Sequence, residues 1–181
     1  GFFRSHGQTD EREGLIHRRR AQVTMTGATV VVVGGGGREH ALCLSLDASP
    51  NVASLHCVPG NAGTARMATN HSVDMSTTAL VDLFEHLNAD LVVVGPEAPL
   101  CDGLADACQD AGIACFGPVA ALAHLEGSKL HAKQAMQAAG VPTASYVRLD
   151  ATTNLDAALD AFAGQPWVVK RDVLAGGKGV V

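Results

Sequence analysis

Short apolar segments alternate with helical patterns along the middle of this 181-residue chain, and that alternation most constrains its fold. The apolar segments are residues 29–33, 54–58, 91–94 and 113–116, and two of them are almost pure valine. Strands of this kind are buried on both faces, as in parallel sheets. Between them, residues 80–87 repeat apolar side chains at helical spacing. The order predicts an α/β domain with a doubly wound parallel sheet.

A second helical stripe runs through residues 100–111, and the pattern changes after Gly117 and Pro118. Two helices are predicted next, near residues 119–125 and 129–139. Ser128 is placed to cap the second of these helices. The chain therefore divides into an unstructured leader over residues 1–24, a first domain over residues 25–126 and the start of another over residues 127–181.

Within that last part, the sequence predicts a strand at residues 145–149, an amphipathic helix at 155–162 and a strand at 167–171. Residues 180–181 are the expected beginning of a returning strand. This second α/β unit is unfinished, so we do not expect it to close a core by itself.

Charge and cysteine usage limit the partners. The formal net charge is −5, and beyond residue 24 there are eight basic and fifteen acidic side chains. An acidic body is a poor partner for nucleic acid or an anionic membrane surface, so the expected partners are small molecules. Five cysteines without a Cys-x-x-Cys pair indicate neither a disulfide framework nor a zinc site, which fits the cytoplasm. No apolar run approaches the roughly 20 residues that span a bilayer.

Four consecutive glycines follow the first predicted strand and precede a helix. Glycine lets the backbone approach an anion, and the helix N-terminus offers free N–H groups. A tight turn without a ligand is the alternative. The dinucleotide pattern G-x-G-x-x-G fails at its last position, and no acid ends the second strand, so a phosphorylated ribose fits better than a nicotinamide cofactor. The candidate residues here are Gly34, Gly35, Gly36, Gly37, Arg38, Glu39 and His40.

Two more loops follow later strands of the predicted sheet. In a doubly wound sheet they share the carboxyl edge with the glycine loop, where ligands collect. Each loop by itself also fits ordinary turn chemistry, but together they predict one crevice, with Glu97 as a partner for a hydroxyl or amine. The candidate residues of these loops are Gly60, Asn61, Gly63, Thr64, Pro96 and Glu97.

Two lysine-bearing segments suit a polyphosphate. Lys129 opens a predicted helix, and Lys170 lies on a predicted strand that leads into a glycine-rich hairpin with Gly176, Gly177, Lys178 and Gly179. Point charges and backbone donors of this kind suit phosphoryl transfer. The segment is not a Walker A loop, because neither Ser nor Thr follows the lysine. Solvated surface lysines are the alternative.

Five motifs occur in an order and spacing that resemble the glycinamide ribonucleotide synthetase (phosphoribosylamine-glycine ligase) family of the ATP-grasp superfamily. They are Gly-Gly-Arg-Glu-His-Ala, Pro-Gly-Asn-Ala-Gly-Thr-Ala, Val-Gly-Pro-Glu-Ala-Pro-Leu, Phe-Gly-Pro and Leu-Glu-Gly-Ser-Lys, and the resemblance covers residues 28–181. It implies a Rossmann-like pre-ATP-grasp domain followed by the incomplete start of an ATP-grasp domain. It also implies a purine-biosynthesis ligase that joins glycine to 5-phosphoribosylamine with ATP and magnesium.

By the same resemblance, Lys129 and Lys170 are the nucleotide-contacting lysines and residues 176–179 are the phosphate flap. The family's magnesium ligands would lie beyond residue 181, so this chain is expected to be inactive and no catalytic residue is assigned. Arg171, Val173 and Gly176 depart from the common family pattern, and a valine would strain the turn if that position used a positive φ. The alternatives are a non-catalytic phosphate- or nucleotide-binding module and another ATP-grasp ligase or carboxylase.

Overall fold

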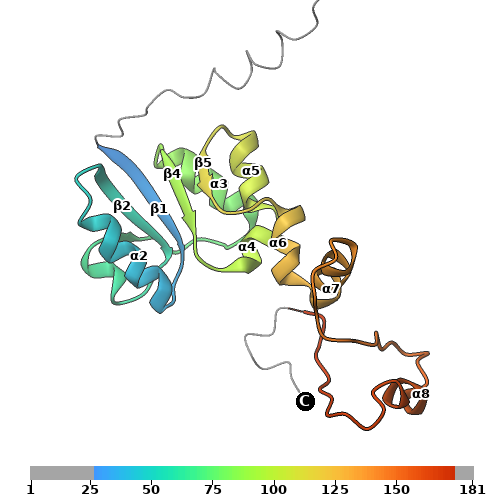
Figure 1. The fold of residues 1–181 in the computed structure, drawn as a ribbon. Coiled ribbons are helices and arrows are strands. Elements are labelled where there is room, and N and C mark those ends of the chain that lie inside the picture. The colour runs from blue at the N-terminus through green and yellow to red at the C-terminus, as the bar shows by residue number, and fades with distance from the viewer. Residues whose placement is uncertain (1–26, 174–181) are drawn as a thin grey trace, which may run out of the picture.

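The computed structural model describes residues 27–173, and its centre is a five-stranded sheet in which every paired strand is parallel. The strands lie in the order β3-β2-β1-β4-β5 (Figure 1). Their bounds are β1 Ala28–Gly34, β2 Val52–Pro59, β3 Thr69–Asn70, β4 Leu91–Val94 and β5 Ala114–Phe116. The doubly wound α/β fold expected from the sequence is confirmed.

Helices connect the strands and continue beyond the sheet. They are α2 Gly37–Asp47, the 3-10 turn η2 Thr64–Arg66, α3 Thr77–His86, α4 Glu97–Cys101, α5 Leu104–Asp110, α6 Ala120–Gly127, α7 Lys129–Ala138 and α8 Leu155–Asp160. Figure 1 shows α6, α7 and α8 running away from the sheet toward the end of the described chain. No helix among these is long and apolar enough to cross a membrane.

The valine run of β1 is buried on both faces of the sheet. Val31 and Val33 belong to a cluster with side chains of α3 and α5, whereas Val30 and Val32 belong to a second cluster with Cys43 of α2. Burying each of these valine side chains stabilises the folded state by about 1.5–3 kcal/mol relative to leaving it exposed. Figure 1 shows helices on both sides of the sheet. Because neither face of β1 is exposed to solvent, this strand needs no polar face.

The strand order also fixes where a ligand can lie. From β1 the chain moves outward in one direction to β2 and β3, and then crosses to the other side of β1 for β4 and β5. The loops that follow the neighbouring strands β1 and β4 therefore diverge at the carboxyl ends of these two strands, which is called a topological switch point. Parallel α/β sheets bind ligands at such a point. The glycine loop follows β1, and the loop with Glu97 follows β4.

Several predicted elements differ from the structure. The helical stripe over residues 100–111 is divided into α4 and α5, because Gly103 between them has φ +84°. Strand β3 was not predicted, and with two residues it is too short to show a period. The strands predicted at residues 145–149 and 167–171 are wrong, apart from a single bridge at Lys170.

The physical reason for the two missing strands lies in pairing. An extended segment becomes a strand when a neighbour accepts and donates its backbone hydrogen bonds. Within residues 27–173, no strand lies beside either segment. Trp167 and Val168 accordingly remain 51% and 62% exposed.

Candidate functional site

The second loop is fastened to the glycine loop by direct hydrogen bonds. The N–H of Gly60 donates to the carbonyl of Gly34 at 3.1 Å. The side-chain amide of Asn61 donates to the carbonyls of Gly35 and Gly36 at 3.0 and 3.3 Å. Loops that are separate in the sequence therefore form one surface at the carboxyl edge of the sheet.

Inside the second loop, polar side chains bond to one another rather than point outward. The side-chain oxygen of Asn61 accepts from the N–H groups of Gly63 and Thr64 at 2.7 and 3.0 Å. The Thr64 hydroxyl is fully buried and donates to Asn70 at 2.8 Å, and the Asn70 amide donates to the carbonyl of Asn61 at 2.8 Å. We therefore assign Asn61 and Thr64 to holding the loop in shape. Sequence reasoning missed Asn70, since it lies outside every recognised motif.

Gly60 shows why this loop requires glycine. Its φ is +71°, a backbone conformation that residues with a side chain rarely adopt. A Cβ at this position would also overlap the side-chain amide of Asn70. The glycine thus permits both the turn and the Asn70 contact.

Glu39 joins the loops that follow β1 and β4. Its carboxylate is 4% exposed and accepts from the N–H of Gly36 at 2.6 Å and from Nε of Arg38 at 2.9 Å. It packs so closely against Gly95 that a Cβ there would overlap it. Burial alone would raise the pKa of Glu39, but the hydrogen bonds from Arg38 and Gly36 outweigh burial and lower that pKa. Glu39 therefore acts as an internal anchor: its buried carboxylate holds the glycine loop at Gly36 and packs against the loop that follows β4 at Gly95.

Few backbone N–H groups of the glycine loop remain available to a ligand, because several polar groups of this loop are already bonded within the protein. The backbone N–H groups of Gly37 and Arg38, in the first turn of α2, donate to no acceptor within residues 27–173. A Cβ on Gly37 would meet nothing within 4 Å, so open space lies beside it. The Arg38 side chain is 60% exposed, and His40 packs against Gly63. The first turn of α2 thus has two backbone N–H groups without an acceptor among the described residues, and it carries the exposed side chain of Arg38.

The loop after β4 completes this edge. The N–H of Gly95 donates to the carbonyl of Val33 at 3.0 Å, which holds the loop beside β1. Pro96 precedes α4 in an extended conformation, and Glu97 is the first residue of that helix and half-buried. The described residues provide no hydrogen-bond partner for the Glu97 carboxylate. A ligand hydroxyl or amine could take that place.

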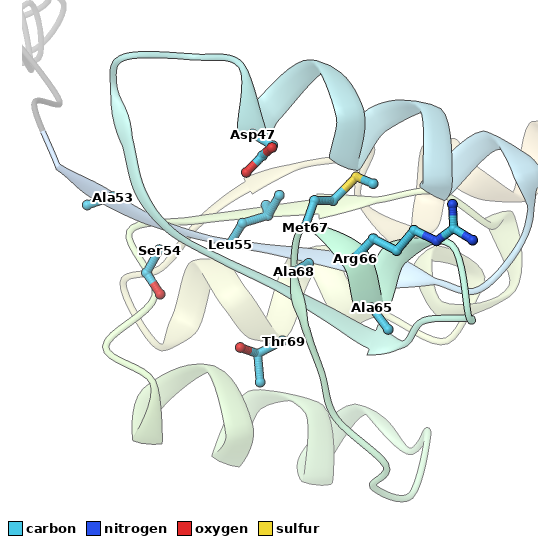
Figure 2. Close-up of a pocket in the computed structure, with 9 residues that line it drawn as sticks. All are labelled: Asp47, Ala53, Ser54, Leu55, Ala65, Arg66, Met67, Ala68 and Thr69. Carbon is cyan, nitrogen blue, oxygen red and sulfur yellow. The ribbon is translucent and has the colours of Figure 1, made fainter.

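A shallow depression of about 470 Å³ lies elsewhere on the domain (Figure 2). It borders β2 and β3 and reaches Asp47 at the end of α2, whereas the glycine loop lies at the start of that helix. None of the predicted site residues lines it. We therefore place the candidate site by the hydrogen-bonded loops. The depression is lined by Asp47, Ala53, Ser54, Leu55, Ala65, Arg66, Met67, Ala68 and Thr69.

The two lysine segments meet at the start of α7. Ser128 caps this helix by accepting from the N–H of His131 at 3.0 Å, as the sequence predicted. The ammonium of Lys129 donates to the carbonyl of Val173 at 3.1 Å. Lys170 is exposed, two residues before Asp172. The flap residues Gly176, Gly177, Lys178 and Gly179 lie outside the described residues, as do residues 1–24 and 180–181.

Val173 does not have the strained backbone considered above. The non-glycine residues with positive φ among those described are Asn88 and Ala163. The departure from glycine at Val173 thus imposes no left-handed conformation on it.

No group of three or more His, Cys, Asp or Glu side chains in the described part of the chain is arranged to hold a metal ion. We therefore assign no metal ligand among the described residues.

Family models match the chain over most of its length. The model described as "Phosphoribosylglycinamide synthetase, N domain" matches residues 28–126. The model described as "Phosphoribosylglycinamide synthetase, ATP-grasp (A) domain" matches residues 127–181. A parallel sheet with loops gathered at its switch point defines the doubly wound α/β class of ligand-binding domains. The chain belongs to the phosphoribosylglycinamide synthetase family.

Curated relatives carry the name phosphoribosylamine–glycine ligase. The protein from Streptomyces coelicolor is 58% identical over 154 residues, which cover 84% of this chain and 36% of that relative. The protein from Mycobacterium tuberculosis is 55% identical over 157 residues, which cover 84% of this chain and 37% of the relative. The chain therefore spans just over a third of the length of these relatives.

Solved structures show the same architecture. The phosphoribosylamine–glycine ligase of Thermotoga maritima aligns with a TM-score of 0.64 and 32% identity, covering 84% of this chain and 35% of that one. The biotin carboxylase domain of the Hydrogenobacter thermophilus 2-oxoglutarate carboxylase, solved with MgADP, ADP and bicarbonate, aligns with a TM-score of 0.65 and 21% identity. That alignment covers 86% of this chain and 37% of the carboxylase domain. At that identity the likeness concerns the fold alone.

Proposed function

We propose that this chain provides the amino-terminal part of a ligase that joins glycine to 5-phosphoribosylamine, with ATP converted to ADP and phosphate. The observation that carries the proposal is the convergence of three loops on the first turn of α2. Asn61 and Glu39 fasten those loops from within, and the donors of Gly37 and Arg38 remain outward. The curated relatives bear the name of this reaction.

In this proposal the first turn of α2 binds the phosphate of the phosphoribosyl group. Backbone N–H groups and the positive end of the helix dipole attract a phosphate, and the dipole contributes about 0.3–2 kcal/mol. The Arg38 guanidinium adds a charged donor at the same place. Glu97 then contacts a ribose hydroxyl or the amine. His40, Gly63 and Pro96 shape the wall of this site.

ATP is assigned to the second part of the chain. Lys129 and Lys170 supply two positive charges, one at the start of α7 and one near the end of the described residues. The proposed flap, residues 176–179, follows Lys170 in the sequence. When bound, magnesium would neutralise charge on the transferring phosphoryl group. In this proposal the described residues place the phosphoribosyl group and the nucleotide.

The same proposal includes the division of the chain near residues 126 and 127, with a substrate-binding domain before it and the start of an ATP-grasp domain after it. It also includes action in the cytoplasm on small molecules, without nucleic acid or membrane partners. The acidic balance of charge beyond residue 24 supports that choice of partners.

A hybrid ligase tests the proposal. Residues 28–181 of this chain replace the matching part of the Streptomyces coelicolor ligase, and ADP formation is measured with ATP, magnesium, glycine and 5-phosphoribosylamine. We expect ADP release that requires both glycine and 5-phosphoribosylamine. A folded hybrid that binds ribose 5-phosphate but releases no ADP would favour a non-catalytic phosphate-binding module. ADP release that needs bicarbonate instead of glycine would indicate a carboxylase.

A further inference from the structure

Two segments that are 44 residues apart in the sequence meet at the first turn of α7. The Ser128 hydroxyl lies 3.1 Å from both carboxylate oxygens of Asp172, and the N–H of Leu130 donates to one of them at 3.1 Å. In Figure 1 the described chain returns to α7 just before it ends. One carboxylate therefore ties the end of this chain segment to the start of a helix.

Lys129 adds a second contact between the start of α7 and the segment that contains Asp172. Its ammonium donates to the carbonyl of Val173 at 3.1 Å, so the lysine lies along the segment that carries Lys170. Both lysines are exposed, and each side chain alone would sample many rotamers. The contacts of Asp172 and Val173 limit the positions that Lys129 can take.

The charge of Asp172 suits this position. The N–H of Leu130, then the Ser128 hydroxyl and the Lys129 charge, outweigh a small desolvation cost and hold the pKa of Asp172 below its usual value. A lowered pKa in the folded chain means that the carboxylate stabilises the junction at neutral pH. That contribution is lost as pH falls through the lowered pKa. A carboxylate near a helix N-terminus is also favoured by the dipole of α7.

We propose that Asp172 is a positioning residue for the nucleotide, which holds the segment after Lys170 against α7 and so keeps Lys129 beside it. This inference rests on the proposed function, because it takes both lysines as contacts of ATP. Charges fixed before binding stabilise a polyphosphate better than charges that must first be ordered. Asp172 itself bonds to Ser128 and Leu130, and its own charge would repel ATP, so its effect passes through Lys129.

An NMR titration of the 181-residue chain with MgATP tests the proposal. Asp172→Ala should weaken the apparent affinity, followed at the Lys129 and Leu130 amides, by about tenfold, because Lys129 is then no longer held in place before ATP binds; tenfold corresponds to about 1.4 kcal/mol. The Leu130 amide should also exchange faster with solvent. Asp172→Glu should restore part of the affinity, and Asp172→Asn serves if the alanine variant loses the α7 helix. Asp150→Asn is the matched control, since Asp150 accepts similar bonds in another turn.

Ribose 5-phosphate is titrated in parallel and should bind equally well to all variants. Equal ATP affinity in the wild type and in Asp172→Ala would overturn the positioning role and leave the proposed function standing. If the wild type shows no ATP-induced shift at Lys129 at millimolar ATP, the nucleotide role of that lysine fails, and the positioning role of Asp172 fails with it. Weakening of ribose 5-phosphate binding by Asp172→Ala would show a general structural effect and would also overturn the proposal.

Discussion

The side-chain amide of Asn61 donates to the carbonyl of Gly35 at 3.0 Å, so the loop after β2 holds the loop after β1 in place. Asn61 also accepts from the N–H groups of Gly63 and Thr64, which uses its side-chain oxygen. The residue thus serves the site through the shape of the glycine loop. This relationship predicts effects of mutation that differ from those of a ligand contact.

Asn61→Ala should lower the free energy of unfolding by about 1–3 kcal/mol, because several buried or half-buried polar groups lose their partner. Binding of ribose 5-phosphate should weaken as well, since the glycine loop is released. Urea unfolding and an NMR titration measure the two effects. Asn51→Ala, at an exposed turn, should change neither. Loss of binding without any loss of stability would instead identify Asn61 as a direct ligand contact.

Glu39→Gln should destabilise the domain at neutral pH by about 1–3 kcal/mol, because the charge that accepts from Gly36 and Arg38 is lost. The folded pKa of Glu39 is below its ordinary value of 4.5, so the wild-type contribution is present above pH 4.5 and disappears as pH falls through the lowered pKa. The stability difference between wild type and variant should therefore shrink in acid. A difference that stays constant from pH 7 to pH 3 would contradict this role for the carboxylate.

Gly60→Ala should destabilise the domain by at least about 1–3 kcal/mol, because φ is +71° and the new methyl group overlaps Asn70. Thermal unfolding followed by circular dichroism measures this effect. Gly112→Ala is a useful control, since Gly112 also has positive φ but its Cβ would meet nothing within 4 Å. The difference between the two variants isolates the steric conflict with Asn70. Equal melting temperatures would show that Asn70 moves aside freely.

Much of the fold could be predicted from the sequence, because the spacing of apolar residues within a single segment indicates whether it forms a strand or a helix. The valine run of β1 and the helical spacing of α3 reflect burial on known faces, and both elements form where expected. The loop positions followed from the rule that ligands collect at the carboxyl edge of a parallel sheet. The same local reasoning wrongly predicted strands at residues 145–149 and 167–171, because a strand depends on a neighbour that local sequence does not reveal.

The roles of individual site residues were less accessible. A glycine-rich motif does not show that Glu39 fills its own loop or that Thr64 is fully buried. Asn70 lies outside every recognised motif, and Asp172 lies in the segment compared with the family's phosphate loop but was given no role there. Each acts on residues that the topology brings close. A buried polar network of this kind becomes visible only when the loops are placed in three dimensions.

Gly36 and Gly37 differ as positions at which to test the proposed phosphate site by substitution. A Cβ on Gly36 would lie 3.0 Å from a carboxylate oxygen of Glu39, so a larger side chain there would disturb the internal anchor. A Cβ on Gly37 would meet nothing within 4 Å, so substitution at this position changes the outward space. Gly37→Val should therefore preserve the fold and block close approach of an anion.

We propose above that the first turn of α2 binds the phosphate of a phosphoribosyl group, and one titration tests this directly. An NMR titration with ribose 5-phosphate compares the wild type, Gly37→Val and Lys178→Ala under the same conditions. We predict shifts at the Gly37 and Arg38 amides of the wild type, loss of binding in Gly37→Val and unchanged binding in Lys178→Ala. Weakening in Lys178→Ala as large as that in Gly37→Val would place the ligand at the flap and rule out the first turn of α2 as its site.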